Sequence, residues 1–219
     1  MKILSINVSE PKKVIFNGKE LITSIYKKPI DGSVEVTDIG ISGDRQADLK
    51  VHGGYDKAVY AYSHKHYKKW SEEMGHTYSD YGLVGENLTI DDFDEKLVKI
   101  GDEFEVGSCK FQVSQPRIPC YKIGIKMNSR DFPKKFSSSC LLGGYLRVIE
   151  SGSIKNGDEL KLVKTDNGSL SLYEISDILF NDIKNIGKMK AALDLKYLTE
   201  EIKERFRERL MKLGDFDSL

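Results

Sequence analysis

Cysteine, proline and tryptophan are scarce in this chain, whose 219 residues include three cysteines, five prolines and one tryptophan. The cysteines are odd in number and far apart, which argues against a disulfide framework and is typical of a reducing compartment. No C-x-x-C pair occurs, and this disfavours a structural zinc site. Each thiol must therefore be judged by its own surroundings.

A charge of one sign is also missing, since lysine plus arginine and aspartate plus glutamate both number 34. Proteins that bind nucleic acids generally carry a basic excess, so we expect no stable nucleic-acid binding. No apolar run approaches the roughly 20 residues of a membrane helix. Residues 1–6 are too polar for a signal peptide. The expectation is a cytoplasmic protein without membrane attachment.

Hydrophobic side chains are plentiful enough for a folded core, at 39% of the residues. Up to about residue 165 they occur in short segments separated by glycine-rich turns, which favours a closed or nearly closed β-barrel. One helix is expected to interrupt the strands, from about Ala58 to Met74. The predicted strands are 3–8, 21–26, 34–41, 104–106, 111–113, 146–149 and 160–163. Gly107 and Ser108 predict a hairpin between the strands 104–106 and 111–113.

From about residue 166 the pattern is helical. Ser171 and Glu174 have capping-box spacing, in which two side chains satisfy backbone amides of the first helical turn. A short helix is predicted over 187–195, and Thr199 is a predicted N-cap before apolar residues at helical spacing. We therefore predict a mainly β chain in two domains. These are a barrel of residues 1–165 and a small three-helix domain of residues 166–219.

Cys120 has the setting expected of a reactive thiol. Two prolines stiffen residues 115–119 in front of it. Arg117 and Lys122 bracket it with positive charge, which favours the thiolate, the form that attacks or binds a metal. Arg117 is also suited to grip a phosphate or carboxylate with two hydrogen bonds. The alternative is a buried and inert cysteine, which is our interpretation of the other two cysteines.

Two further segments are rich in glycine and polar residues. Residues 40–54 combine glycines, acids and His52, and this predicts either a loop that offers amides and an imidazole to a ligand or a tight corner with a structural histidine. The spacing is not that of a G-x-G-x-x-G dinucleotide fingerprint. Residues 85–89, taken alone, are interpreted as a plain turn.

Three motifs follow one another along the chain. They are Gly43-Asp44-Arg45-Gln46-Ala47-Asp48 running into Val51-His52-Gly53-Gly54, then Gly85-Glu86-Asn87-Leu88, then Ser114-Gln115-Pro116-Arg117 with Pro119-Cys120-Tyr121-Lys122. Together they resemble the MOSC domain family, named for the C-terminal region of molybdenum-cofactor sulfurase. The helical tail makes the chain most similar to the stand-alone, YiiM-type members of that family, so the resemblance spans nearly the whole chain.

The resemblance implies a MOSC-type β-barrel that binds a molybdenum cofactor (Mo-molybdopterin), in which a pterin dithiolene holds the metal and a phosphate ends the molecule. The motif cysteine of the family, which ligates molybdenum, corresponds to Cys120, and a thiolate suits a metal already held by sulfur. Cys120 would then be both metal ligand and catalytic residue. The implied cofactor contacts are Arg117, Lys50 and Lys122 to the phosphate or pterin, and His52, Gly53, Gly54, Asn87 and Gln115 to the pterin edge or substrate.

For this type of protein the resemblance implies reduction of N-hydroxylated compounds such as hydroxylaminopurine bases, in which R-NHOH takes up two electrons and two protons and gives R-NH2 and water. The chain has no flavin, nicotinamide or iron–sulfur pattern, so an external flavin-type reductase is expected to supply the electrons. Two alternatives stay open: a sulfur carrier with a persulfide on Cys120, and a non-catalytic module that binds or delivers the cofactor. A homo-oligomer also stays open.

Overall fold

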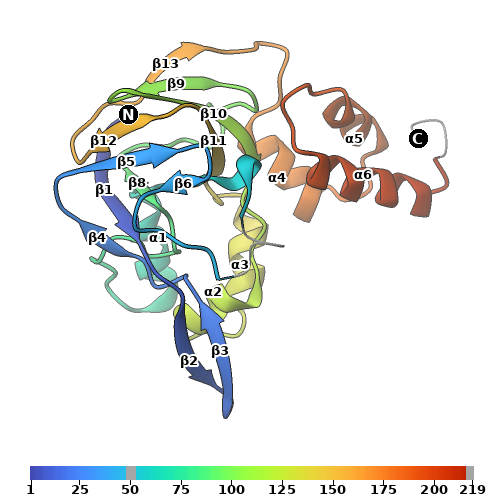
Figure 1. Cartoon of the computed structure of the whole chain (residues 1–219). Helices are drawn as coiled ribbons and strands as arrows, with labels where there is room; N and C mark the ends of the chain where they lie inside the picture. The colour runs from blue at the N-terminus through green and yellow to red at the C-terminus, as the bar shows by residue number, and fades with distance from the viewer. Residues whose placement is uncertain (48–52, 216–219) are drawn as a thin grey trace.

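The computed structural model describes residues 1–47 and 53–215, and strands dominate it (Figure 1). The strands are β1 (Ile3–Val8), β2 (Lys12–Phe16), β3 (Lys19–Thr23), β4 (Lys28–Ile30), β5 (Ser33–Thr37), β6 (Gly40–Ile41), β7 (Val59–Ser63), β8 (Leu88–Ile90), β9 (Glu103–Val106), β10 (Cys109–Pro116), β11 (Gly144–Glu150), β12 (Gly152–Lys155) and β13 (Lys161–Lys164). The helices are the 3-10 turn η1 (Tyr55–Lys57), α1 (Lys65–Met74), α2 (Tyr121–Lys126), α3 (Phe132–Ser139), α4 (Leu172–Phe180), α5 (Ile186–Leu193) and α6 (Glu200–Lys212).

The largest sheet has eight strands in the order β13-β9-β10-β11-β7-β8-β1-β4. The two edge strands of this sheet are β13 and β4. Within the described residues β13 pairs only with β9 and β4 pairs only with β1, so the edges do not pair with each other. The sheet-dominated fold is confirmed, whereas the closed barrel is not and stays a prediction. A smaller sheet has the order β12-β5-β6, and β2 and β3 form a hairpin that projects from the body (Figure 1).

The helix expected from Ala58 to Met74 is wrong in its first half. Residues Val59–Ser63 form β7, and helix α1 begins only at Lys65. Strand β7 pairs with β11 on one side and with β8 on the other, and all its residues are buried. A strand buried on both faces shows no alternation of apolar and polar residues, so its sequence pattern does not separate it from a helix.

Two hairpins illustrate what local sequence does and does not reveal. The predicted hairpin around Gly107 is confirmed, with Cys109 opposite Val106 across β9 and β10. The hairpin of β2 and β3 was not predicted, although Asn17 and Gly18 at its tip both have positive φ, 50° and 74°, as a type I′ turn requires. The strand predicted over 21–26 ends at Thr23, and the residues after it leave the hairpin.

The three C-terminal helices form where the sequence predicts them. The Ser171 hydroxyl accepts from the Glu174 amide at 3.2 Å, and the Glu174 carboxylate accepts from the Ser171 amide at 2.8 Å, so the capping box is confirmed. Apolar side chains of all three helices join the same buried cluster as the large sheet. The division of the chain near residue 165 stays a prediction. None of the helices in residues 1–47 and 53–215 has the length and apolar character that a membrane crossing needs.

Candidate functional site

A cavity opens beside Cys120, where strand β10 gives way to helix α2. Cys120 is the N-cap residue of α2: its backbone is extended (φ −116°, ψ 167°) and its carbonyl accepts from the Ile123 amide at 3.1 Å. Its side chain is partly exposed, whereas the other two cysteines are buried. The end of a buried strand and a proline-stiffened loop thus present this thiol to the cavity.

Arg117 forms a buried cationic wall of the same cavity. Its guanidinium carbon lies 4.7 Å from the centroid of the Tyr60 ring, a cation–π contact, and it donates a hydrogen bond to the Val84 carbonyl. Burial acts to lower the pKa of Arg117, but the neighbouring phenols and the Cys120 thiol outweigh that effect and raise it. The guanidinium therefore keeps its charge beside the thiol.

Asp44 and Asn87 connect the cavity to the strands behind it. One carboxylate oxygen of Asp44 pairs with the buried ammonium of Lys27, and the other accepts from Asn87 Nδ2 at 2.9 Å. Asn87 Oδ1 accepts from the Tyr60 amide at 3.1 Å, and its second amide hydrogen goes to a backbone carbonyl. Burial lowers the pKa of Lys27 and Asp44 opposes that shift. Asn87 thus lines the cavity while its side chain is engaged with the protein.

Two features of the cavity wall were not predicted from the sequence. The Ser24 hydroxyl is buried and has no hydrogen-bond partner within the described residues, although Ser24 lines the cavity. Gly85 has φ +88°, and a Cβ there would lie 2.8 Å from Cγ1 of Ile25. An unsatisfied buried polar group costs on the order of 1–3 kcal/mol. A ligand that bonds to Ser24 would remove that cost.

The structure brings four of the nine residues predicted for the site into one cavity wall. The four that share the cavity wall are Cys120, Arg117, Asn87 and Lys122. Two glycines are described but do not line it, Gly53 and Gly54. Lys50 and His52 lie outside the described residues. Wall residues that were not predicted as cofactor contacts include Ser24, Lys27, Gln46 and Tyr145.

Gln115, the remaining predicted cofactor contact, does not line the cavity. Its side-chain oxygen accepts from the Thr199 hydroxyl at 2.7 Å, and its amide donates to the Pro116 carbonyl at 3.3 Å. Both Gln115 and Thr199 are buried, and Thr199 is the N-cap of α6. The Gln115 amide therefore couples the end of β10 to the C-terminal helices, only two residues before Arg117.

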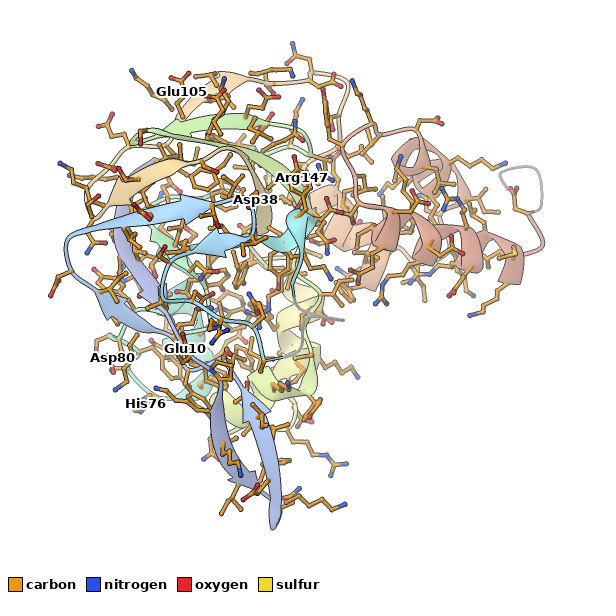
Figure 2. The ribbon with its side chains drawn as sticks, in the orientation of Figure 1. Glu10, Asp38, His76, Asp80, Glu105 and Arg147 are labelled. Carbon is orange, nitrogen blue, oxygen red and sulfur yellow. The ribbon has the colours of Figure 1, made fainter. Side chains whose placement is uncertain are left out.

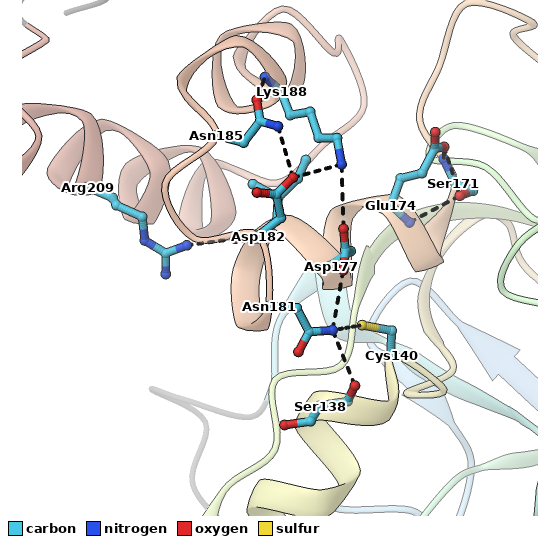
Figure 3. Close-up of polar contacts among 11 residues, drawn as sticks. Ser138, Cys140, Ser171, Glu174, Asp177, Asn181, Asp182, Asn185, Lys188 and Arg209 are labelled. Atoms are coloured by element: carbon cyan, nitrogen blue, oxygen red, sulfur yellow. Dashed lines mark hydrogen bonds and ion pairs between the residues drawn. The ribbon is translucent and has the colours of Figure 1, made fainter.

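Cys109 and Cys140 have structural surroundings. The Cys140 thiol accepts from Asn181 Nδ2 at 3.1 Å, and the same amide donates to the Ser138 carbonyl at 3.2 Å, so Asn181 joins α3 to α4 (Figure 3). Burial raises the pKa of the Cys109 and Cys140 thiols to about 11. Both thiols are therefore held protonated, as their inert interpretation requires.

The donor set at Cys120 fits an anionic cofactor held through sulfur. The charged side chains among the described wall residues are all cations, Lys27, Arg117 and Lys122. Arg117 and Lys122 donate to the backbone carbonyls of Val84 and Ile22 rather than to carboxylates. The cavity measures about 60 Å³, which admits a terminal group rather than a whole pterin. A whole pterin would therefore need space beyond these described wall residues.

Comparison with known proteins identifies the family to which this chain belongs. The sequence profile of the MOSC domain matches residues 48–161. The chain is 34% identical over 211 residues to the uncharacterized protein YflK of Bacillus subtilis (strain 168), covering 96% of this chain and 95% of that one. The chain therefore belongs to the MOSC domain family, and the resemblance predicted from its three motifs is confirmed.

Relatives with other names also match. Protein YiiM of Escherichia coli (strain K12) is 36% identical over 143 residues, 64% of each chain. The crystal structure of YiiM from Geobacillus stearothermophilus is similar with a TM-score of 0.81 at 33% identity, covering 95% of this chain and 98% of that one. A protein named reductase from Gibberella moniliformis (strain M3125 / FGSC 7600) is 29% identical over 180 residues, 81% of this chain and 32% of that protein.

Proposed function

We propose that this protein binds the molybdenum cofactor through Cys120 and reduces N-hydroxylated compounds. The observation that carries the proposal is the partly exposed Cys120 thiol beside the buried, fully charged Arg117 guanidinium. Membership of the MOSC family supports the class of cofactor. The reductase name of the relative from Gibberella moniliformis supports the type of reaction.

The wall residues have separate roles in this proposal. The Cys120 thiolate would hold the metal of the cofactor, which would supply two-electron redox chemistry to the site. Arg117 and Lys122 would hold the anionic end of the cofactor, and the Ser24 hydroxyl would donate a hydrogen bond to it. The net reaction converts R-NHOH, two electrons and two protons into R-NH2 and water. An external flavin-type reductase would deliver the electrons.

Metal and pterin content test the cofactor assignment. The protein is purified from a host that makes the cofactor, as wild type, Cys120→Ala and Cys109→Ala. We expect molybdenum and pterin in the wild type and in the Cys109→Ala control, whose thiol is buried away from the site, and their loss in Cys120→Ala. Wild-type protein without molybdenum or pterin would overturn the proposal.

Turnover tests the reaction. The loaded protein is mixed with a flavin reductase, NADH and 6-hydroxylaminopurine, and adenine is measured by chromatography. Adenine formation that requires Cys120 supports a reductase, whereas bound cofactor without turnover identifies a non-catalytic module. The same cationic wall also suits a persulfide anion on Cys120. A mass increase of one sulfur on Cys120 after incubation with a cysteine desulfurase, in protein that carries no molybdenum, would replace the reductase with a sulfur carrier.

A further inference from the structure

A second cavity of about 640 Å³ lies beside the Cys120 cavity and shares Lys27 with it. Residues 26–29, residues 76–83 and the end of helix α2 form its walls. Its volume lies within the roughly 300–1,000 Å³ of small-molecule pockets, whereas the cavity at Cys120 admits a terminal group. The second cavity therefore has the room for a ring system that the first one lacks.

Three partly buried tyrosines line this second cavity, Tyr26, Tyr78 and Tyr81. The Tyr78 ring meets the His76 ring edge-on at 4.9 Å, and the two labelled residues His76 and Asp80 lie at the same edge of the molecule (Figure 2). No hydroxyl of the three tyrosines makes a hydrogen bond within the described residues. The wall thus offers aromatic faces together with polar groups that a ligand can use.

Lys126 adds a partly buried cation to the same wall. Its ammonium donates to the Ile25 carbonyl at 2.9 Å and to the Gly82 carbonyl. An ammonium has three donors. Within the described residues the third donates no hydrogen bond and no carboxylate pairs with the group, while the ammonium lies 5.8 Å from the centroid of the Tyr26 ring. Burial lowers the pKa of Lys126 to about 8, with Arg117 and Lys27 acting in the same direction. An acceptor on a ligand would offset this unfavourable burial of charge.

We propose that the second cavity binds a planar nitrogen heterocycle the size of a purine or a pterin, stacked on its tyrosines with an acceptor edge at Lys126. Stacking on aromatic side chains accepts any planar base, and the cation selects a ring with a carbonyl or an unprotonated nitrogen at that edge. The inference deepens the proposed function and rests on it for the two candidate sources, the substrate base and the ring of the cofactor.

Titration calorimetry on cofactor-free protein tests the inference, with hypoxanthine and neopterin as probes. We expect saturable binding of at least one probe, weakened about tenfold by Tyr78→Ala and also weakened by Lys126→Met. Tyr173→Ala is the matched control, because Tyr173 is a partly buried tyrosine with a lysine ammonium, that of Lys96, 5.1 Å from its ring, but outside the cavity. It should bind the probes as the wild type does.

The two sources differ in the protein loaded with cofactor. Continued binding of hypoxanthine after loading assigns the cavity to the substrate base, and loss of both probes assigns it to the pterin. Absence of saturable binding, or wild-type affinity in both Tyr78→Ala and Lys126→Met, would overturn the inference. Because the titration needs no molybdenum, its result stands apart from the metal assay that tests the proposed function.

Discussion

The guanidinium of Arg117 lies over the ring of Tyr60, and both side chains are buried. The Tyr60 hydroxyl donates to the Leu142 carbonyl at 2.7 Å, while Arg117 donates to the Val84 carbonyl. The pair therefore links β7 to the segments that precede β8 and β11. A charge stacked and bonded in this way occupies one position beside Cys120, which a flexible surface cation would not.

Replacing Arg117 by lysine should keep the charge and lose that geometry. We expect the free energy of unfolding to fall by about 1–3 kcal/mol, because the Val84 carbonyl loses its partner in a buried place. Molybdenum occupancy should fall with it. Urea unfolding and metal analysis provide the measurements, and exposed Arg130→Lys is the control. Equal unfolding free energies for the two variants would contradict the role assigned to the stack.

Thiol labelling should separate the three cysteines. Cys120 is partly exposed, whereas Cys109 and Cys140 are buried and have pKa values raised to about 11 by burial. Iodoacetamide at pH 7.5 should therefore alkylate Cys120 in the folded, cofactor-free protein and reach the other two only after unfolding. Peptide mass spectrometry identifies the labelled positions. Comparable labelling of Cys140 in the native protein would show that its packing against α4 is wrong.

Thr199→Val should loosen the attachment of the last helix to β10. The substitution removes the hydrogen bond to Gln115 and the N-cap contact to the Ile202 amide while keeping the side-chain volume. We expect a loss of about 1–2 kcal/mol in unfolding free energy and faster hydrogen exchange at the start of α6. Exposed Thr37→Val serves as the control. Unchanged exchange in α6 would argue that Gln115 does not hold it.

Gly85→Ala and Gly32→Ala form a matched pair. Both glycines have positive φ, +88° and +83°, but a Cβ at Gly85 would lie 2.8 Å from Ile25 whereas a Cβ at Gly32 meets nothing within 4 Å. Each variant should lose about 1 kcal/mol through backbone strain. Gly85→Ala should lose more and also displace the wall of the Cys120 cavity. Thermal unfolding and cofactor occupancy measure the difference, which vanishes if the close approach to Ile25 is absent.

Lys126 should make stability depend on pH in the alkaline range. Burial lowers its pKa from 10.5 to about 8 in the folded protein. Between those values the unfolded chain binds more protons at this lysine, so the free energy of unfolding gains up to about 1.4 kcal/mol per pH unit as the pH rises. Urea unfolding at pH 8 and pH 10 should show this gain in the wild type relative to Lys126→Met. The comparison cancels the opposite contribution of the buried thiols, and identical pH profiles would refute the shift.

Whether the location of a site residue could be predicted depended on how far its partners lie from it in the sequence. Cys120 and Arg117 share one short loop, so their proximity follows from the stiffness of a segment with two prolines. Gln115 is in the same segment, yet it bonds to Thr199, a partner 84 positions away. The strand β7 was missed because complete burial removes the alternation by which strands are recognised.

The sequence by itself determined the local features of this protein: the capping box at Ser171, the hairpin at Gly107, the charged setting of Cys120 and the motifs that place the chain in the MOSC family. These depend on neighbours within a few residues. Only the tertiary structure decided that Ser24 is left without a partner in the cavity wall, that Lys27 lies between two cavities and that Arg117 stacks on Tyr60. Those relationships arise because the sheet brings distant segments together and removes them from water, which no local pattern encodes.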